Sequence, residues 1–322
     1  MTQFVLIGLG AGVASALLFA SIASGAPVSI LLFYLAPLPI LLAGIGWSQF
    51  AALIAAVVAA AGLGAAFGFW FLLAHLAGVG IPAYLLAYVA MLARHGPDGA
   101  IEWYPAGKLV LWTAGIAAVS TALTIPVFGS DLDSYRAAVK QIFERVMRVQ
   151  LGTPAGEPLR LPNGGDPGAV LDLLATVMPP MAAAISMVTA LFNLWLAARI
   201  VRISGRLARA WPEFSELTFP AMTPVVLLAA IALSFVPSIV GLAAGMLAAC
   251  LLLAYVILGL AVVHQLTRAL SARGVIRGAV WLVVIVLGWP AIVVALIGLA
   301  DGLLDLRKMN KPNSNFPSNK PE

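Results

Sequence analysis

The sequence predicts an all-α integral membrane protein, a polytopic helical bundle of about nine spans with eight or ten as alternatives. Of its 322 residues, 62% are hydrophobic and only 10% are charged, whereas about 25% of the residues in a soluble domain are charged. No Asp, Glu, Lys or Arg occurs before Arg94. A charge at the centre of a transmembrane helix costs roughly 2.5 to 3.5 kcal/mol, so this uncharged stretch indicates several consecutive spans.

The predicted spans are apolar runs long enough to cross about 30 Å of hydrocarbon. In chain order they are residues 4–23, 28–46, 49–68, 69–93, 108–128, 178–198, 220–240, 242–265 and 276–300. Residues 1–306 are predicted to form a single membrane domain. Residues 307–322 are rich in Pro, Asn and Ser and are predicted to be a disordered tail.

Small and kinking residues recur inside these runs. Glycines spaced four apart let helix backbones approach closely, and we expect them to pack helices of this chain together, with docking of a partner as the alternative. The pairs are Gly8 and Gly12, Gly64 and Gly68, and Gly241 and Gly245. Prolines are expected to kink or break spans. They are Pro37, Pro39, Pro82 and Pro290, with Pro179 and Pro180 opening the sixth span.

The polar segment 129–177 interrupts the apolar pattern. Ser130 and Asp133 are spaced as an N-terminal capping box, and apolar residues then recur with helical periodicity. We predict an amphipathic helix lying at the membrane interface. The Pro- and Gly-rich stretch 152–168 that follows is predicted to be an irregular loop.

A second basic segment follows the sixth span. Arg199, Arg202, Arg206 and Arg209 recur every three or four residues and are therefore predicted to share one helix face. A cytoplasmic anchor that follows the positive-inside rule is one interpretation. The alternatives are contact with anionic lipid headgroups or docking to a partner such as a cytoplasmic ATPase.

Few residues of this sequence suggest chemistry. His75 and His264 lie in or near spans and Asn193 lies within one, so they are candidates either for contact with a substrate or for interhelical packing. No histidine has a second ligand at the spacing of a helical metal site, and Cys250 stands alone. We therefore predict no catalytic residues, metal or cofactor, and no enzymatic activity.

The net charge of +5 does not indicate nucleic acid, because the basic residues lie at the ends of spans. The lipid bilayer is the predicted partner. Other membrane subunits or an ATPase on another chain are further candidates, since the sequence contains no nucleotide-binding loop.

Three stretches of the chain resemble the YybS-like family of bacterial predicted membrane proteins, whose function is unknown. They are Pro37-Leu38-Pro39, Pro212-Glu213-Phe214 through Phe219-Pro220, and Gly298 through Asp301 to Arg307-Lys308. The resemblance implies a bacterial inner membrane location. The family is remotely similar to the substrate-binding subunits of energy-coupling-factor transporters and to the rod-shape protein MreD.

That resemblance yields two functional hypotheses. The first is a solute-binding or transport subunit that relies on a partner for energy. The second is a cell-envelope scaffold or assembly protein of the MreD type that moves no solute. A polar cavity at the membrane midplane would favour the first hypothesis, and a filled interior would favour the second.

Overall fold

The computed structural model describes residues 1–304 and 307, except 155, 160, 162–163 and 269. Contacts within the chain divide it into two compact units. Unit 1 comprises Met1–Trp211 and Val226–Leu251, and unit 2 comprises Pro212–Val225 and Leu252–Glu322. That residues 1–306 act as one domain stays a prediction, and apart from Arg307 the predicted tail lies outside the described residues.

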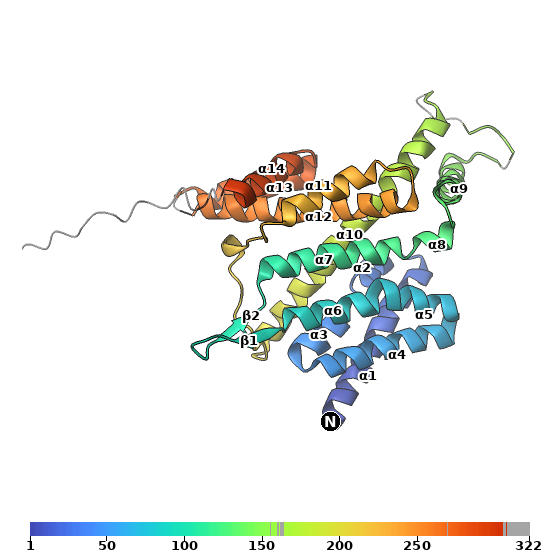
Figure 1. The fold of residues 1–322 in the computed structure, drawn as a ribbon. Helices are drawn as coiled ribbons and strands as arrows, with labels where there is room; N and C mark the ends of the chain where they lie inside the picture. The colour runs from blue at the N-terminus through green and yellow to red at the C-terminus, as the bar shows by residue number, and fades with distance from the viewer. Residues whose placement is uncertain (155, 160, 162–163, 269, 305–306, 308–322) are drawn as a thin grey trace, which may run out of the picture. The chain divides into compact units, whose positions relative to one another are not determined.

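The first part of unit 1 is a series of helices with several breaks (Figure 1). They are α1 (Thr2–Ala20), the 3-10 turn η1 (Ser21–Ser24), α2 (Pro27–Tyr34), α3 (Leu38–Gly46), α4 (Gln49–Phe67), α5 (Phe69–His75), the π-helical η2 (Leu76–Gly80) and α6 (Ile81–Ala90). The second predicted span is broken around Pro37, and Pro82 follows the π-helical turn. Gly68 has φ +97° and ends α4, so it does not form a helix-packing pair with Gly64 as predicted.

A short hairpin and four helices follow. They are β1 (Ala93–His95), β2 (Ile101–Trp103), α7 (Ala106–Ala122), α8 (Ile125–Phe128), α9 (Leu132–Leu151) and α10 (Pro167–Ile203). The strands are antiparallel, and Arg94 pairs with Glu102. The remaining elements are η3 (Phe214–Glu216), α11 (Thr223–Ser234), α12 (Ile239–Leu266), α13 (Arg273–Leu287) and α14 (Pro290–Leu304).

Helices α9 and α10 correct two predictions. The N-cap of α9 is Asp131, whose carboxylate accepts from the Ser134 backbone N–H at 2.9 Å, so the capping box lies one residue beyond the predicted Ser130 and Asp133. The 37-residue helix α10 begins at Pro167 and continues through Pro179 and Pro180. These prolines therefore do not open a helix, and the end of the polar segment 129–177 is already helical.

Seven stretches of the described chain are long and apolar enough to cross a membrane. Six are Thr2–Ser24, Pro27–Gly46, Gln49–Phe67, Phe69–Ala90, Ala106–Phe128 and Pro167–Ile203, and the seventh is Ile239–Leu266. The predicted run 220–240 contains the 12-residue helix α11. The predicted run 276–300 is two 15-residue helices, α13 and α14, separated at Gly288 with φ +70°. The predicted count of nine is therefore not confirmed.

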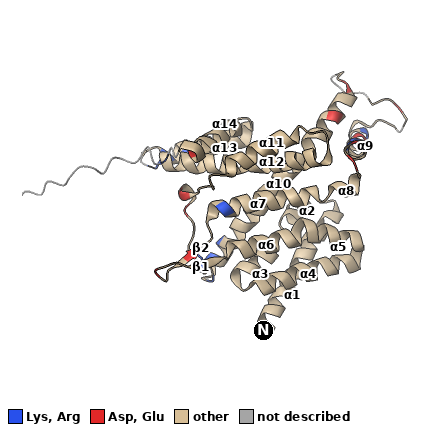
Figure 2. Cartoon of the chain, in the orientation of Figure 1, with Lys and Arg blue, Asp and Glu red and all other residues tan. Residues whose placement is uncertain are grey.

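The spans of unit 1 expose most of their apolar surface. In the six candidate spans that lie wholly in unit 1, only 22% to 39% of the most apolar 18-residue stretch is buried. Leu17, Val57 and Trp70 are among the exposed side chains. Figure 2 shows the ribbon of α1 to α6 almost free of charge, with Lys, Arg, Asp and Glu near the β1–β2 hairpin and α9. Lipid is the solvent in which such a surface is favourable.

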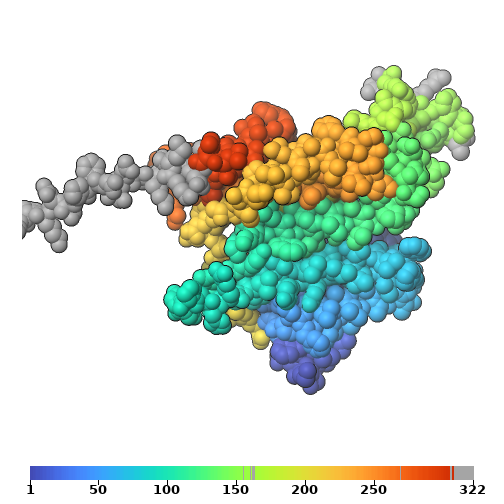
Figure 3. Space-filling model, viewed as in Figure 1, coloured from blue at the N-terminus to red at the C-terminus, as the bar shows by residue number. Residues whose placement is uncertain are grey.

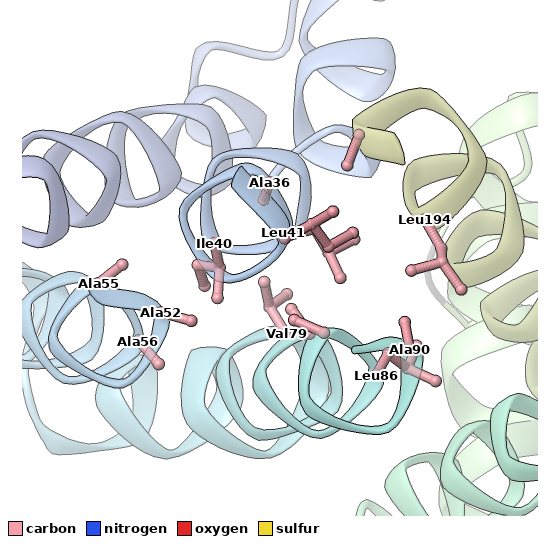
Figure 4. Close-up of a cluster of buried hydrophobic side chains, with 14 of the residues drawn as sticks. Ala36, Ile40, Leu41, Ala52, Ala55, Ala56, Val79, Leu86, Ala90 and Leu194 are labelled. Atoms are coloured by element: carbon pink, nitrogen blue, oxygen red, sulfur yellow. The ribbon is translucent and has the colours of Figure 1, made fainter. Parts of the chain in front are cut away.

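Helix α3 lies at the centre of unit 1, where it contacts α1, α4, α6 and α10. Its Ile40 and Leu41 are fully buried. Figure 4 shows these two side chains among small residues of α4 and larger ones of η2, α6 and α10. The small partners, which include Ala52, Ala55 and Ala56, allow the helices to approach closely. Close packing of this kind holds membrane helices together, because lipid supplies no hydrophobic drive for their association.

The most extensive helix contact in unit 1 joins α1 to α4, and the two surfaces adjoin in Figure 3. A Cβ atom added at Gly8 would lie 2.7 Å from Ile54, and one at Gly12 would lie 2.8 Å from the carbonyl oxygen of Ala55. The Gly8 and Gly12 pair therefore packs helices of the same chain, as predicted.

Unit 2 contains a second close approach and a buried ion pair. A Cβ atom at Gly259 of α12 would overlap the carbonyl group of Val294 in α14. Asp301 is buried and accepts from Nε of Arg307 at 2.9 Å. The same guanidinium donates to the backbone oxygen of Ser215 at 2.9 Å, so this pair joins the end of α14 to the segment around η3.

Candidate functional site

A cavity of about 280 Å³, partly open to the surface, lies among the helices of unit 1. Its walls come from α1, α2, α3, α5, η2, α6, α7 and α10. Three of the lining residues, Pro37, Val79 and Ala117, each stand within one residue of the midpoint of their span. A residue at the midpoint of a helix that crosses the bilayer lies near the middle of the hydrocarbon layer.

The lining of this cavity is mainly apolar. Its polar side chains include Tyr34 of α2, Ser120 of α7, and Ser186 and Thr189 of α10. None of the lining residues is an Asp, Glu, Lys, Arg or His. These hydroxyl groups were not among the predicted site residues, although Ser186, Thr189 and Asn193 are spaced at three and four residues and so follow one face of α10.

His75 is fully buried at the end of α5 and is not part of the lining. Its Nε2 lies 3.1 Å from Oγ of Ser15, which donates its own proton to the carbonyl oxygen of Ala36 at 2.7 Å. A hydroxyl carries a single proton, so Nε2 must be the donor and Nδ1 the bare acceptor. Nδ1 has no hydrogen-bond partner among the described residues. The ring meets Phe19, a lining residue, edge to face at 5.2 Å.

Asn193 is also fully buried and beside the cavity rather than on its wall. Its amide group donates at 2.8 Å to the carbonyl oxygens of Tyr34 and Thr189, two residues that line the cavity. Asn193 therefore makes the interhelical hydrogen bond that was one of its two predicted roles. Its Oδ1 has no partner in the part of the chain that the structure describes.

Ser15 and Asn193 share one structural task. The interruption of the helix between α2 and α3 leaves backbone carbonyl groups without the N–H donors that a continuous helix would supply. Asn193 bonds the carbonyl of Tyr34, and Ser15 bonds that of Ala36, one on each side of Leu35. These two polar residues therefore stabilise the broken helix that forms one wall of the cavity.

The arginine segment differs from its prediction. Helix α10 ends at Ile203, and Gly205 has φ +68°. Arg199 and Arg202 are thus helical but Arg206 and Arg209 are not, and the four do not share a helix face. The guanidinium of Arg202 stacks on Trp211 at 5.0 Å and that of Arg206 on Trp47 at 4.9 Å.

Arg209 holds the β1–β2 hairpin to the membrane helices. Its guanidinium donates to the carbonyl of Ala90, the last residue of α6, at 2.8 Å and to that of Tyr104 at 2.6 Å. Burial lowers the pKa of Arg209 from its ordinary value. Arg199, Arg202 and Arg206 are exposed, and in the described residues none of the four has an acidic partner within salt-bridge distance. Their predicted docking to lipid or to a partner stays a prediction.

His264 belongs to unit 2, at the end of α12. Its ring meets Phe214 edge to face at 6.0 Å, and its backbone oxygen accepts from Arg277 at 2.7 Å. Cys250 is buried. In the described part of the chain, no three His, Cys, Asp or Glu side chains come together as a metal site.

A second cavity of about 320 Å³ lies at the base of the β1–β2 hairpin, beside the start of the span Ala106–Phe128. Its lining includes Arg94 and Glu102, which form an exposed ion pair at 2.7 Å. Lys108, also on its wall, stands 5.9 Å from the ring of Tyr104. Exposed ion pairs of this kind contribute little stability.

A family model described as "Predicted membrane protein (DUF2232)" matches residues 13–302, about nine tenths of the chain. The match confirms the resemblance to the YybS-like family. Among the curated proteins and among the solved structures, nothing matches the chain. The remoter similarities to energy-coupling-factor subunits and to MreD stay predictions.

Proposed function

The chain belongs to the DUF2232 family of predicted membrane proteins and is a multi-pass membrane protein, and we propose that it is a solute-binding or transport subunit. The proposal places it in the bacterial inner membrane and assigns the energy source to a partner. It is a non-enzymatic role, in which the chain binds a solute and any ATP hydrolysis occurs on another protein.

The observation that carries the proposal is the cavity of about 280 Å³ among the spans of unit 1. A scaffold that works through helix contacts needs no such space, because membrane helices pack through close contact of small residues. The volume is close to the roughly 300 Å³ at which small-molecule sites begin. Broken helices beside it, at Pro37 and η2, are a further feature of transporter sites.

Affinity purification of the full chain in mild detergent tests the proposal, with mass spectrometry of the proteins and small molecules that come with it. The matched variant is Ala117→Leu, which fills the cavity from α7, with Gly10→Leu as a control because a Cβ at Gly10 meets nothing within 4 Å. We expect a small molecule that copurifies with the wild type and with Gly10→Leu but is lost from Ala117→Leu. Cell-wall or division proteins copurifying from all three, with no small molecule, would favour the MreD-type scaffold instead.

The number of crossings belongs to the same proposal. Nine crossings require α11 and the α13–α14 region to cross once each, and they put the two termini on opposite sides of the membrane. Helices of 15 residues extend about 22 Å, less than the hydrocarbon thickness. If α13 and α14 form a hairpin that returns to its starting side, the count is eight and the termini share a side. Reporter fusions at both termini and at Gly99 distinguish these topologies.

A further inference from the structure

Three hydroxyl groups share the wall of the unit 1 cavity. Ser120 comes from α7, and Ser186 and Thr189 come from successive turns of α10. Tyr34 is the remaining lining residue with a hydroxyl group, and it comes from α2. Two helices that are far apart in sequence thus bring polar groups to one apolar space.

These three hydroxyls have no hydrogen-bond partner within the described chain, which sets them apart from most other helical Ser and Thr residues. The usual arrangement is donation to the carbonyl group four residues earlier. It occurs at Thr113 to Leu109, at Thr121 to Ala117 and at Thr176 to Asp172, with distances of 2.8 to 2.9 Å. A hydroxyl without a partner in apolar surroundings is unfavourable, so the cavity hydroxyls are available to bond an occupant.

The lining also restricts the charge and size of that occupant. The described lining contains no Asp, Glu, Lys, Arg or His, and an unpaired ion in these apolar surroundings would be strongly disfavoured. The volume of about 280 Å³ is nearly twice the roughly 150 Å³ of an apolar cavity that binds one benzene ring. The fitting occupant is therefore neutral, mainly apolar and about two rings in size.

We propose that this cavity binds a neutral, mostly apolar molecule through a hydroxyl or carbonyl group that contacts Ser120, Ser186 and Thr189. The inference rests on the proposed function, because it names the class of solute for the same cavity. Hydroxyl groups donate and accept, so they suit an alcohol as well as a ketone. Each hydrogen bond of this neutral kind contributes about a two- to tenfold gain in affinity.

Two probes that differ by a single group test the inference: 2-naphthol and naphthalene. Their binding to the full chain in lipid nanodiscs is followed by probe fluorescence, with empty nanodiscs subtracted to remove partition into lipid. The first variant combines Ser120→Ala, Ser186→Ala and Thr189→Val. Thr121→Val is its matched control, since that hydroxyl is already bonded to Ala117. Each single substitution is measured as well, and thermal unfolding checks that every variant is folded.

We expect the wild type to bind 2-naphthol at least about tenfold more tightly than naphthalene. The triple variant loses that preference and keeps its affinity for naphthalene, whereas Thr121→Val changes neither. Equal binding of both probes to the wild type and to the triple variant would overturn the hydroxyl inference while leaving a solute cavity in place. Binding of neither probe, or binding that survives Ala117→Leu, would overturn the inference as well, whereas failure of the copurification test would contradict the proposed function.

The natural occupant could come from the membrane or from water, since isoprenoid alcohols and neutral soluble metabolites share this chemistry. Displacement of 2-naphthol by the neutral lipid fraction of a cell extract indicates the first source. Displacement by the neutral aqueous fraction indicates the second, and either result supports the inference. Displacement by acidic fractions alone would contradict it.

Discussion

Two regions of unit 1 differ in how closely their helices pack: the α1–α4 contact leaves no space between the helices, whereas the helices around the cavity do. At the α1–α4 contact, two unbroken 19-residue helices meet where the glycines of α1 face Ile54 and Val58 of α4, with no room for a Cβ at Gly8 or Gly12. Around the cavity, α7 and α10 face the broken pairs α2–α3 and α5–α6.

The difference between these contacts lies in the backbone. Small residues in register let two straight helices approach along their whole length. A helix broken at Pro37 or by the π-helical turn at η2 changes direction, so its side chains no longer follow the neighbouring helix. A cavity in a membrane bundle therefore depends on where helices break.

The largest expected effect is at the closed contact. Gly12→Leu places a side chain where a Cβ alone would lie 2.8 Å from the Ala55 carbonyl and from Val58. We expect a loss of about 3 kcal/mol or more in the free energy of unfolding, because overpacking forces the backbones apart. Thermal unfolding in detergent measures it, with Gly10→Leu on the open side of α1 as the control. Equal stability of the two variants would show that α1 does not pack on α4 in this way.

Ala117→Leu should have a much smaller effect, because its side chain enters the cavity. Ala55 is equally small and buried but lies in the core cluster. We expect Ala117→Leu to change the free energy of unfolding by about 1 kcal/mol at most, and Ala55→Leu to lower it by roughly 1 to 3 kcal/mol. Chemical denaturation of the two variants side by side measures this contrast. Equal losses would mean that the wall at Ala117 is as tightly packed as the core.

Asn193→Leu tests how the broken wall is held. The substitution removes the bonds to the carbonyl oxygens of Tyr34 and Thr189 at nearly constant size. We expect a loss of roughly 0.6 to 2 kcal/mol, the range for interhelical hydrogen bonds in membranes. Hydrogen exchange at the α2–α3 junction should increase with it. Substitution of the exposed residue Gln150 in Gln150→Leu serves as the control. If Asn193→Leu is as stable as the wild type, the hydrogen bonds of Asn193 do not stabilise the fold.

The smallest effect concerns pH at the start of α9. Hydrogen bonds from the backbone N–H and side chain of Ser134 lower the pKa of the Asp131 carboxyl. A carboxyl with a lowered folded-state pKa stabilises the fold above its unfolded pKa of about 3.9. That contribution is lost as pH falls through the lower, folded pKa. The protection of the Ser134 amide against exchange, measured relative to its intrinsic exchange rate at each pH, should therefore fall below about pH 4. Asp131→Asn keeps the cap but does not titrate, so an unchanged pH response in that variant would exclude Asp131 as the cause.

The candidate site could be predicted from sequence only in part. Pro37 and Pro82 indicated broken helices, because proline removes a backbone donor wherever it occurs. His75 and Asn193 were selected as rare polar groups in apolar runs, yet neither lines the cavity. The arginine face was wrong because helical spacing was extended past Ile203, where Gly205 ends the regular geometry.

By itself the sequence determined the solvent and the secondary structure of most of the chain. Long runs without charge require lipid, and in lipid the backbone must satisfy its own hydrogen bonds, which helices do. Only the tertiary structure decided which polar atoms meet and where space remains. Asn193 bonds Tyr34 across 159 residues and Ser15 meets His75 across 60. Helices that are apolar all round carry no amphipathic pattern to reveal which face turns inward, so such pairings depend on packing alone.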